Sequence, residues 1–227
     1  DPSLTVEEAR SHYVYADFLG FLKAYVWANQ KLRTPADYAL ITRRLLERLA
    51  GENVRYTELN LSVGVMLWRE QDPERNFAAV AEAAAESPVR VRWIFDAVRQ
   101  WGTEQAMTVA RLAAAHQGDG VVGFGVGGDE ARGPIEWFEG VFGWAREQGL
   151  VILPHAGETA GPESVWGAVR LGARRIGHGI RAVEDPQLMS CLKERNIPLE
   201  VCISSNVQTG AVASLAAHPV RRLYDAG

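Results

Sequence analysis

A regular alternation of strand-like and helix-like stretches constrains this chain more than any other feature. From about Glu52 to the C-terminus, six short apolar stretches with strand character each precede a stretch with helical character. The expected strands are 54–63, 89–95, 121–124, 151–153, 174–176 and 198–203. Because parallel strands need a crossover connection, alternation of this kind is typical of a parallel sheet covered by helices.

The helical stretches have recognisable boundaries. They are expected at 6–49, 72–85, 103–116, 135–148, 162–171, 185–195 and 211–225, with Thr103 and Asp185 as helix-starting residues and Gly149 as a stop. Six regular units favour a barrel over a doubly wound sheet. An eight-stranded barrel takes about 250 residues, so we expect an α/β chain with a (β/α)8 TIM-type barrel that lacks its first and last strands. Residues 1–227 would form one such domain, incomplete at both ends.

Polar side chains follow several of the expected strands directly. The strand VILP runs into His155 and, three residues later, Glu158, while the strand RRI runs into Gly177-His178-Gly179. Two further strands run into the glycine-rich GVGGDE and into SSN. In a parallel barrel the functional groups gather at the carboxyl ends of the strands. Two of the five histidines therefore fall at adjacent strand ends of one predicted site.

These residue types suit metal-assisted hydrolysis. A neutral imidazole such as that of His155 is a common zinc ligand, and a nearby carboxylic acid such as Glu158 can pass a proton to a substrate atom. His178 could hold or deprotonate a metal-bound water, whose pKa the metal lowers from 15.7 toward about 7. A single histidine at a strand end is more often a structural residue, but the combination of all three favours a site. His12, His116 and His218 lie in helical patterns and are interpreted as structural.

Composition excludes several classes of protein. A net charge of −4 with scattered lysines and arginines argues against a nucleic-acid binder. No stretch approaches the roughly 18 apolar residues of a membrane span, and the N-terminus lacks the features of a signal peptide. Two cysteines without a CxxC pair fit a reducing cytoplasm. GFGVGGDE has the wrong spacing for a dinucleotide-binding motif. We therefore expect a cytoplasmic protein that acts on a small molecule.

The motifs together resemble the adenosine deaminase family. LPHAGE, then GHG, then EVCISSN and TG occur in that family's order, VVGFGVGGDE resembles its strand-four segment, and YADFLGFLKAY resembles the helix that lids its pocket. The resemblance implies a (β/α)8 barrel with one zinc ion and hydrolytic deamination of a 6-aminopurine nucleoside. It further implies that His155 is the strand-five zinc ligand, that Glu158 protonates purine N1, and that His178 orients and activates the water.

The resemblance also implies contacts to the substrate. Gly128 matches a glycine whose backbone N–H meets purine N3, and Phe18, Leu19 and Leu22 match the apolar lid. The family's strand-one HxH and strand-eight aspartate pair have no counterpart here, so three of four protein ligands to zinc are missing and we expect a piece of a longer enzyme. Ile203 replaces a proline common in the family, and Asn60 replaces a charged residue of some relatives. These two differences bear on the sugar side of the substrate.

Several alternatives stay open at this point. Relatives act on adenosine, on adenine, on methylated adenylate or on aminodeoxyfutalosine, and the lid and strand-two differences make the last a fair rival. A different class is a nucleoside-binding or regulatory relative without catalysis. Nucleobase deaminases with an HxE…PCxxC zinc site are disfavoured, because PCxxC is absent. The sequence does not indicate an oligomeric state.

Overall fold

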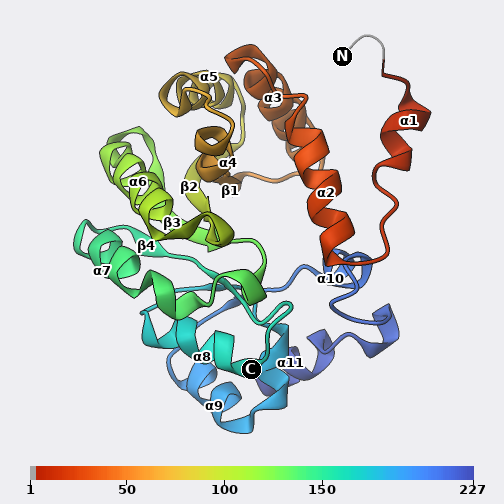
Figure 1. Cartoon of the computed structure of the whole chain (residues 1–227), viewed down its shortest axis with the longest axis vertical. Coiled ribbons are helices and arrows are strands. Elements are labelled where there is room, and N and C mark those ends of the chain that lie inside the picture. The colour runs from red at the N-terminus through yellow and green to blue at the C-terminus, as the bar shows by residue number, and fades with distance from the viewer. Residues whose placement is uncertain (1–3) are drawn as a thin grey trace.

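Parallel strands organise the chain into an α/β fold. The computed structural model describes residues 4–227 (Figure 1). One sheet has the order β1-β2-β3-β4 and another has the order β5-β6-β7, with parallel pairing throughout. The strands are β1 (Tyr56–Leu61), β2 (Arg90–Val98), β3 (Val121–Gly127), β4 (Val151–Ile152), β5 (His155–Ala156), β6 (Ile176–His178) and β7 (Leu199–Glu200). Sequential strands are neighbours, as expected for βα units.

The two sheets are consecutive parts of one strand path. β4 pairs with β3, and β5 pairs with β6, so the segment 151–156 belongs to both sheets. Backbone hydrogen bonds bridge the interruption, because Leu153 donates its N–H to Phe124 at 3.1 Å and Pro154 accepts one from Gly177 at 2.9 Å. The described strands thus occupy the six predicted positions, and the sheet does not close on itself. This arrangement confirms the predicted parallel barrel-type α/β fold.

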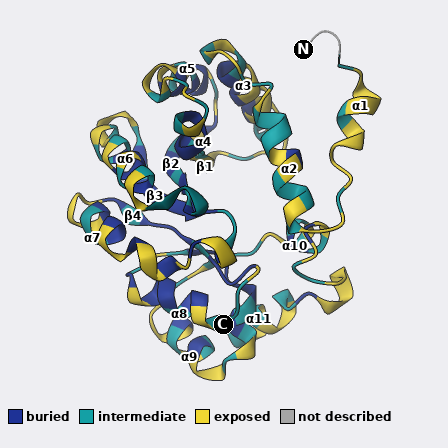
Figure 2. Ribbon diagram, in the orientation of Figure 1, coloured by how far each residue is buried: buried dark blue, intermediate teal, exposed yellow. Residues whose placement is uncertain are grey.

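Helices follow the strands and cover the outside of the sheet. They are α1 (Val6–Ser11), α2 (Phe18–Asn29), α3 (Pro35–Gly51), α4 (Val63–Trp68), α5 (Pro73–Ala85), α6 (Gly102–Ala115), α7 (Glu139–Glu147), α8 (Pro162–Arg170), α9 (Pro186–Glu194), α10 (Ile203–Gln208) and α11 (Val220–Ala226). Figure 2 shows buried positions on the faces of α5 to α9 that turn inward, with exposed positions outside. Among residues 4–227, no helix is long and apolar enough to cross a bilayer.

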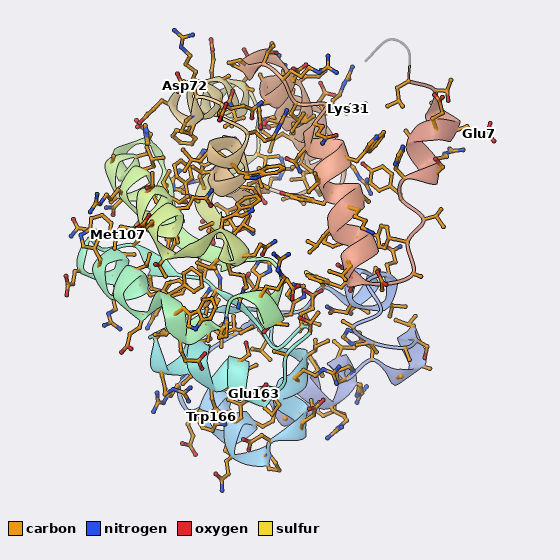
Figure 3. All side chains as sticks on the ribbon, in the orientation of Figure 1. Glu7, Lys31, Asp72, Met107, Glu163 and Trp166 are labelled. Atoms are coloured by element: carbon orange, nitrogen blue, oxygen red, sulfur yellow. The ribbon has the colours of Figure 1, made fainter. Side chains whose placement is uncertain are left out.

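Two apolar clusters hold the helices on the strands. The larger one includes Phe77, Phe95, Phe124 and Phe142, which are nearly or fully inaccessible and join α5 and α7 to β2 and β3. The smaller one lies around Ile176 and joins α8 and α9 to β6. Polar contacts supplement this packing. Trp166, labelled in Figure 3, donates its indole N–H to the Asp185 carboxylate at 2.8 Å and so links α8 to the start of α9.

A half-buried ion-pair network joins the two sheets. Arg175 precedes β6, and its guanidinium binds the carboxylates of Glu200 on β7 and of Glu58 on β1. The Arg175 Nε to Glu200 Oε1 distance is 2.6 Å. Because β1 and β7 are the edge strands of the two sheets, this network links the two edges of the open sheet path.

The N-terminal part differs from the single helical stretch expected at 6–49. It forms three helices, because local side chains cap new helix starts within it. Asp17 accepts the N–H of Gly20 at 2.7 Å and begins α2. Thr34 and Asp37 form a reciprocal capping box, with a proline at the first position, and begin α3. In Figure 1, α2 runs along one side of the molecule between α3 and α10.

Several other boundaries also differ from the sequence expectations, and three of them are informative. The expected strand 198–203 ends at Glu200, and Ile203 begins α10 because the N–H of Asn206 bonds the Cys202 carbonyl at 2.8 Å. Within 211–225, a 3-10 turn at Leu215–Ala217 precedes α11, so the segment is only partly helical. The helix expected to start at Thr103 begins one residue earlier, after Trp101 and without a side-chain cap.

Candidate active site at the strand ends

A cavity of about 430 Å³ lies where the strands end, beside α2. Its walls come from α2, from the ends of β1, β2, β3, β5 and β6, and from α4 and α10. The lining residues are Phe18, Phe21, Leu22, Tyr25, Val26, Asn29, Asn60, Ser62, Val65, Trp68, Asp96, Val98, Gln100, Trp101, Gly127, Gly128, His155, Glu158, His178, Cys202 and Ser205. The structure thus brings His155, Glu158 and His178 into one cavity, as predicted from their places at strand ends.

His155 has a neutral imidazole ring that packs against the backbone of Gly177. Burial is the main reason that the pKa of His155 falls to about 3, and the neighbouring His178 and Arg99 contribute to this shift. The register places His155 beside Gly177, where an added Cβ would lie 2.9 Å from the His155 ring. The glycine before His178 is therefore needed for the two histidine rings to approach, and their centroids lie 5.1 Å apart. A neutral imidazole facing a cavity is able to bind a metal ion.

His178 is buried and held on both sides. Its backbone has the left-handed φ of 64°, uncommon for a residue with a side chain and often found at functional sites. The Asn206 amide Nδ2 lies 3.0 Å from His178 Nδ1, and His178 Nε2 lies 3.3 Å from Glu158 Oε2. Burial lowers the pKa of His178 to about 4, so the imidazole is neutral at physiological pH. The contact with Glu158 is therefore one between a carboxyl group and a neutral ring, not an ion pair.

Glu158 has the protonation behaviour of a general acid. Burial is the main reason that the pKa of Glu158 rises to about 7, and the negative charge of Glu130 contributes to this shift. Its Oε1 also receives a long 3.5 Å hydrogen bond from the Thr209 hydroxyl. A carboxyl group with a pKa near 7 can hold a proton at neutral pH and release it to a substrate atom.

Glu130 and Arg99 hold the loop that carries these groups. The Glu130 carboxylate accepts the backbone N–H groups of residues 157–160 and the hydroxyl of Ser164. Arg99 is fully buried and donates to the carbonyl oxygen of His155. Burial would raise the pKa of Glu130, but these hydrogen bonds and the Arg99 charge together lower it. The ionised Glu130 carboxylate therefore holds the turn between His155 and Glu158 in place through backbone hydrogen bonds.

Asp96 is a cavity residue that the sequence analysis missed. It lies on β2, and its Oδ1 is buried without a hydrogen-bond partner within residues 4–227. Burial raises the pKa of Asp96 to about 7, partly offset by the charge of Arg99. Gly127 separates it from His155, since a Cβ added there would lie about equally close to both side chains. Asp96 comes directly after the expected strand 89–95, so its place at a strand end is the signal that could have found it.

Of the residues expected to contact a substrate, all but Leu19 line the cavity. Phe18 and Leu22 line it from α2, and Gly128 lines it from the end of β3. Leu19 is 56 % exposed and is not part of the lining. Instead, Phe21 and Tyr25 share the α2 wall, because side chains three and four residues apart lie on the same face of a helix.

The described residues supply only part of a zinc site. Within residues 4–227, no cluster of three His, Cys, Asp or Glu side chains is arranged to hold a metal ion. A catalytic zinc ion normally has three protein ligands. His155 has the right chemistry for one of them, because its ring is neutral and faces the cavity.

Comparison with known proteins defines the family. The family model described as adenosine deaminase matches residues 2–227. The aminodeoxyfutalosine deaminase of Streptomyces avermitilis is 40% identical over 97% of this chain and 64% of its own length. The adenosine deaminase of Klebsiella pneumoniae is 36% identical over 100% of this chain and 71% of its own length. The crystal structure of adenine deaminase from Arthrobacter aurescens has a TM-score of 0.93 at 31% identity, covering 100% of this chain and 71% of that one.

The chain therefore belongs to the adenosine deaminase family, as its motifs predicted. The structural likeness confirms the predicted fold class as well. The chain spans less than two thirds of the length of the Streptomyces avermitilis relative.

Proposed function

We propose that this protein catalyses the hydrolytic deamination of a 6-aminopurine nucleoside, giving the 6-oxo product and ammonia. The observation that carries the proposal is that His155, Glu158 and His178 line one cavity, in a chain of the adenosine deaminase family. The proposal covers the protein to which these 227 residues belong, with residues 1–227 as a single barrel domain.

Glu158 would act as the general acid. In the reaction, a water molecule adds to purine C6 and loses one proton while purine N1 gains one. The 6-amino group then leaves as ammonia with the proton given up by the new C6 hydroxyl, which becomes the 6-oxo group. Because the pKa of Glu158 is about 7, its protonated form is well populated at neutral pH and can donate to N1. His178, which faces Glu158 across the same cavity, would orient the attacking water.

His155 would be one of the ligands of a zinc ion. The other ligands implied by the family resemblance, the strand-one HxH and a strand-eight aspartate, are not supplied by residues 4–227. When bound, zinc would lower the pKa of the attacking water and make it a better nucleophile at neutral pH. The low pKa of His155 supports this role, because a metal ligand must be unprotonated.

The remaining cavity residues would bind the substrate. We assign the backbone N–H of Gly128 to purine N3 and the side chains of Phe18 and Leu22 to the apolar cover of the base. Aminodeoxyfutalosine is a second candidate substrate, supported by the 40% identity to the Streptomyces avermitilis enzyme of that name. Adenine is a third, supported by the likeness to the Arthrobacter aurescens structure. A nucleoside-binding relative without catalysis is the alternative of another class.

The test uses the whole protein. Zinc content is measured together with the loss of absorbance near the adenosine band, with adenosine, adenine and aminodeoxyfutalosine offered separately. The proposal predicts one zinc per chain and turnover of at least one of the three compounds. A protein that binds these compounds by calorimetry but releases no ammonia in added zinc would contradict it and support the non-catalytic alternative.

A further inference from the structure

A continuous chain of hydrogen bonds ends at Nδ1 of the His178 ring. It connects the start of α11 through His218 and Asn206 to the His178 ring, and the ring in turn faces Glu158. His218 and Asn206 are buried, and neither of them lines the cavity. They therefore cannot touch a substrate there, and any role in the reaction must act through His178.

The backbone N–H of Val220 determines which groups donate and which accept along this chain of hydrogen bonds. The backbone N–H of Val220 lies 3.0 Å from His218 Nδ1, and a backbone N–H can only donate. His218 Nδ1 must therefore accept. Because burial lowers the pKa of His218, the ring is neutral at physiological pH and carries its proton on Nε2.

The donors and acceptors from His218 to His178 follow in the same way. His218 Nε2 lies 3.3 Å from the Asn206 Oδ1 atom, which can only accept. The Asn206 amide then turns its NH2 group to His178, with Nδ2 3.0 Å from Nδ1. An NH2 group can only donate, so His178 Nδ1 accepts. A neutral His178 must then carry its proton on Nε2, which lies 3.3 Å from Glu158 Oε2.

We propose that Asn206 and His218 are positioning residues that hold His178 as the neutral tautomer with its proton on Nε2. His178 then presents an N–H group to the cavity. It can hold the oxygen of a water or of a carboxylate by donating to it, but it cannot take a proton through Nε2. This inference refines the part given to His178 under the proposed function, on which its catalytic consequence rests: His178 orients the water and is not its base.

The left-handed backbone of His178 fits such a role. A residue with a side chain at φ 64° is strained, and the strain persists only where surrounding contacts hold it. The hydrogen bond from Asn206 on one side and the contact with Glu158 on the other supply such contacts. The ring thus has little freedom to turn over and exchange its two nitrogen atoms.

The direct test is ¹⁵N NMR of the histidine rings in the whole protein. We expect the His178 Nε2 signal to have the shift of a protonated ring nitrogen and the Nδ1 signal that of an unprotonated one. Asn206→Asp replaces the donating NH2 group by a second acceptor, so the proton of His178 should move to Nδ1. His116, which contacts two carboxylates elsewhere, provides the reference signal that should not change.

A matched pair at His218 supports the test if Asn206→Asp fails to fold. His218→Gln retains an N–H donor for Asn206 and should keep the His178 tautomer and most of the rate. His218→Leu removes that donor, so Asn206 is free to turn, and both tautomers should appear. For Asn206→Asp and His218→Leu we expect kcat to fall at least tenfold, with less than a threefold change in KM. If Asn206 and His218 had a structural role alone, these substitutions would lower stability but would not lower kcat while leaving KM nearly unchanged.

Two results would overturn the inference. One is a wild-type His178 with its proton on Nδ1. The other is an Asn206→Asp variant that keeps both the tautomer and the rate. A wild-type protein without deaminase activity would contradict the proposed function alone, because the NMR signals test the hydrogen-bond chain independently of turnover.

Discussion

Gly157 lies in the turn that joins His155 to Glu158, and its replacement by alanine should be costly. Its φ of +68° is left-handed, which costs a residue with a Cβ about 1–2 kcal/mol. The new Cβ would also lie 2.4 Å from a methyl carbon of the fully buried Val165. Overpacking of this kind typically costs about 1–3 kcal/mol. Together these effects predict that Gly157→Ala lowers the free energy of unfolding by about 2–5 kcal/mol.

Urea unfolding followed by circular dichroism measures this change. The matched control is Gly143→Ala in the middle of α7, where no atom lies within 4 Å of the added Cβ. That control should gain up to about 1 kcal/mol, because alanine is the better helix former. A Gly157→Ala variant that loses less than 1 kcal/mol, or no more than the control, would refute the described geometry of the turn.

Two further predictions concern pH. Asp96 has a pKa near 7 when folded and an ordinary value of 3.8, so its burial should destabilise the metal-free chain increasingly between those pH values, by at most about 4 kcal/mol. Asp96→Asn removes this dependence. Chemical unfolding should show that the stability of the variant relative to the wild type is greater at pH 8 than at pH 4.5. An equal difference in the free energy of unfolding at the two pH values would contradict the burial of the Asp96 charge. For His116, burial lowers the pKa, but the hydrogen bonds and charges of Asp119 and Glu74 raise it overall, above its ordinary 6.5. The protonated His116 ring should thus stabilise the fold fully below pH 6.5, and this stabilisation should disappear as the pH rises through the raised pKa. The loss in the free energy of unfolding should be about 1 kcal/mol, because both carboxylates are exposed. Thermal unfolding of His116→Gln across this range should lack that slope, and an unchanged slope would refute the assignment.

The fold and the main site residues could be predicted because they depend on periodic or local features. Alternating strands and helices indicate a parallel sheet, and strand ends in such a sheet share one edge. His155 and His178 therefore had to be neighbours once their strands were recognised, and the register confirms it through the pairing of Ala156 with His178.

Other parts depend on contacts between distant segments, which the sequence does not display. Glu130 follows a glycine-rich stretch that suggested a ligand loop, but its carboxylate binds the backbone of residues 157–160. His218 was interpreted as a structural residue near a helix end, yet it is connected to His178 by hydrogen bonds through Asn206. Asn206 itself follows an apolar stretch that suggested a strand through Ile203. The chain leaves the sheet after Glu200, so Asn206 belongs to a short helix.

The most direct test of the central claim is the Glu158→Gln variant of the whole protein. Glutamine has nearly the same shape as the protonated acid but cannot release a proton to purine N1. The variant should bind zinc and substrate as the wild type does, because Glu158 is assigned no part in holding the metal. Its kcat should fall by a factor of about 100 or more, the usual contribution of a general acid. A variant that deaminates at close to the wild-type rate would contradict the account.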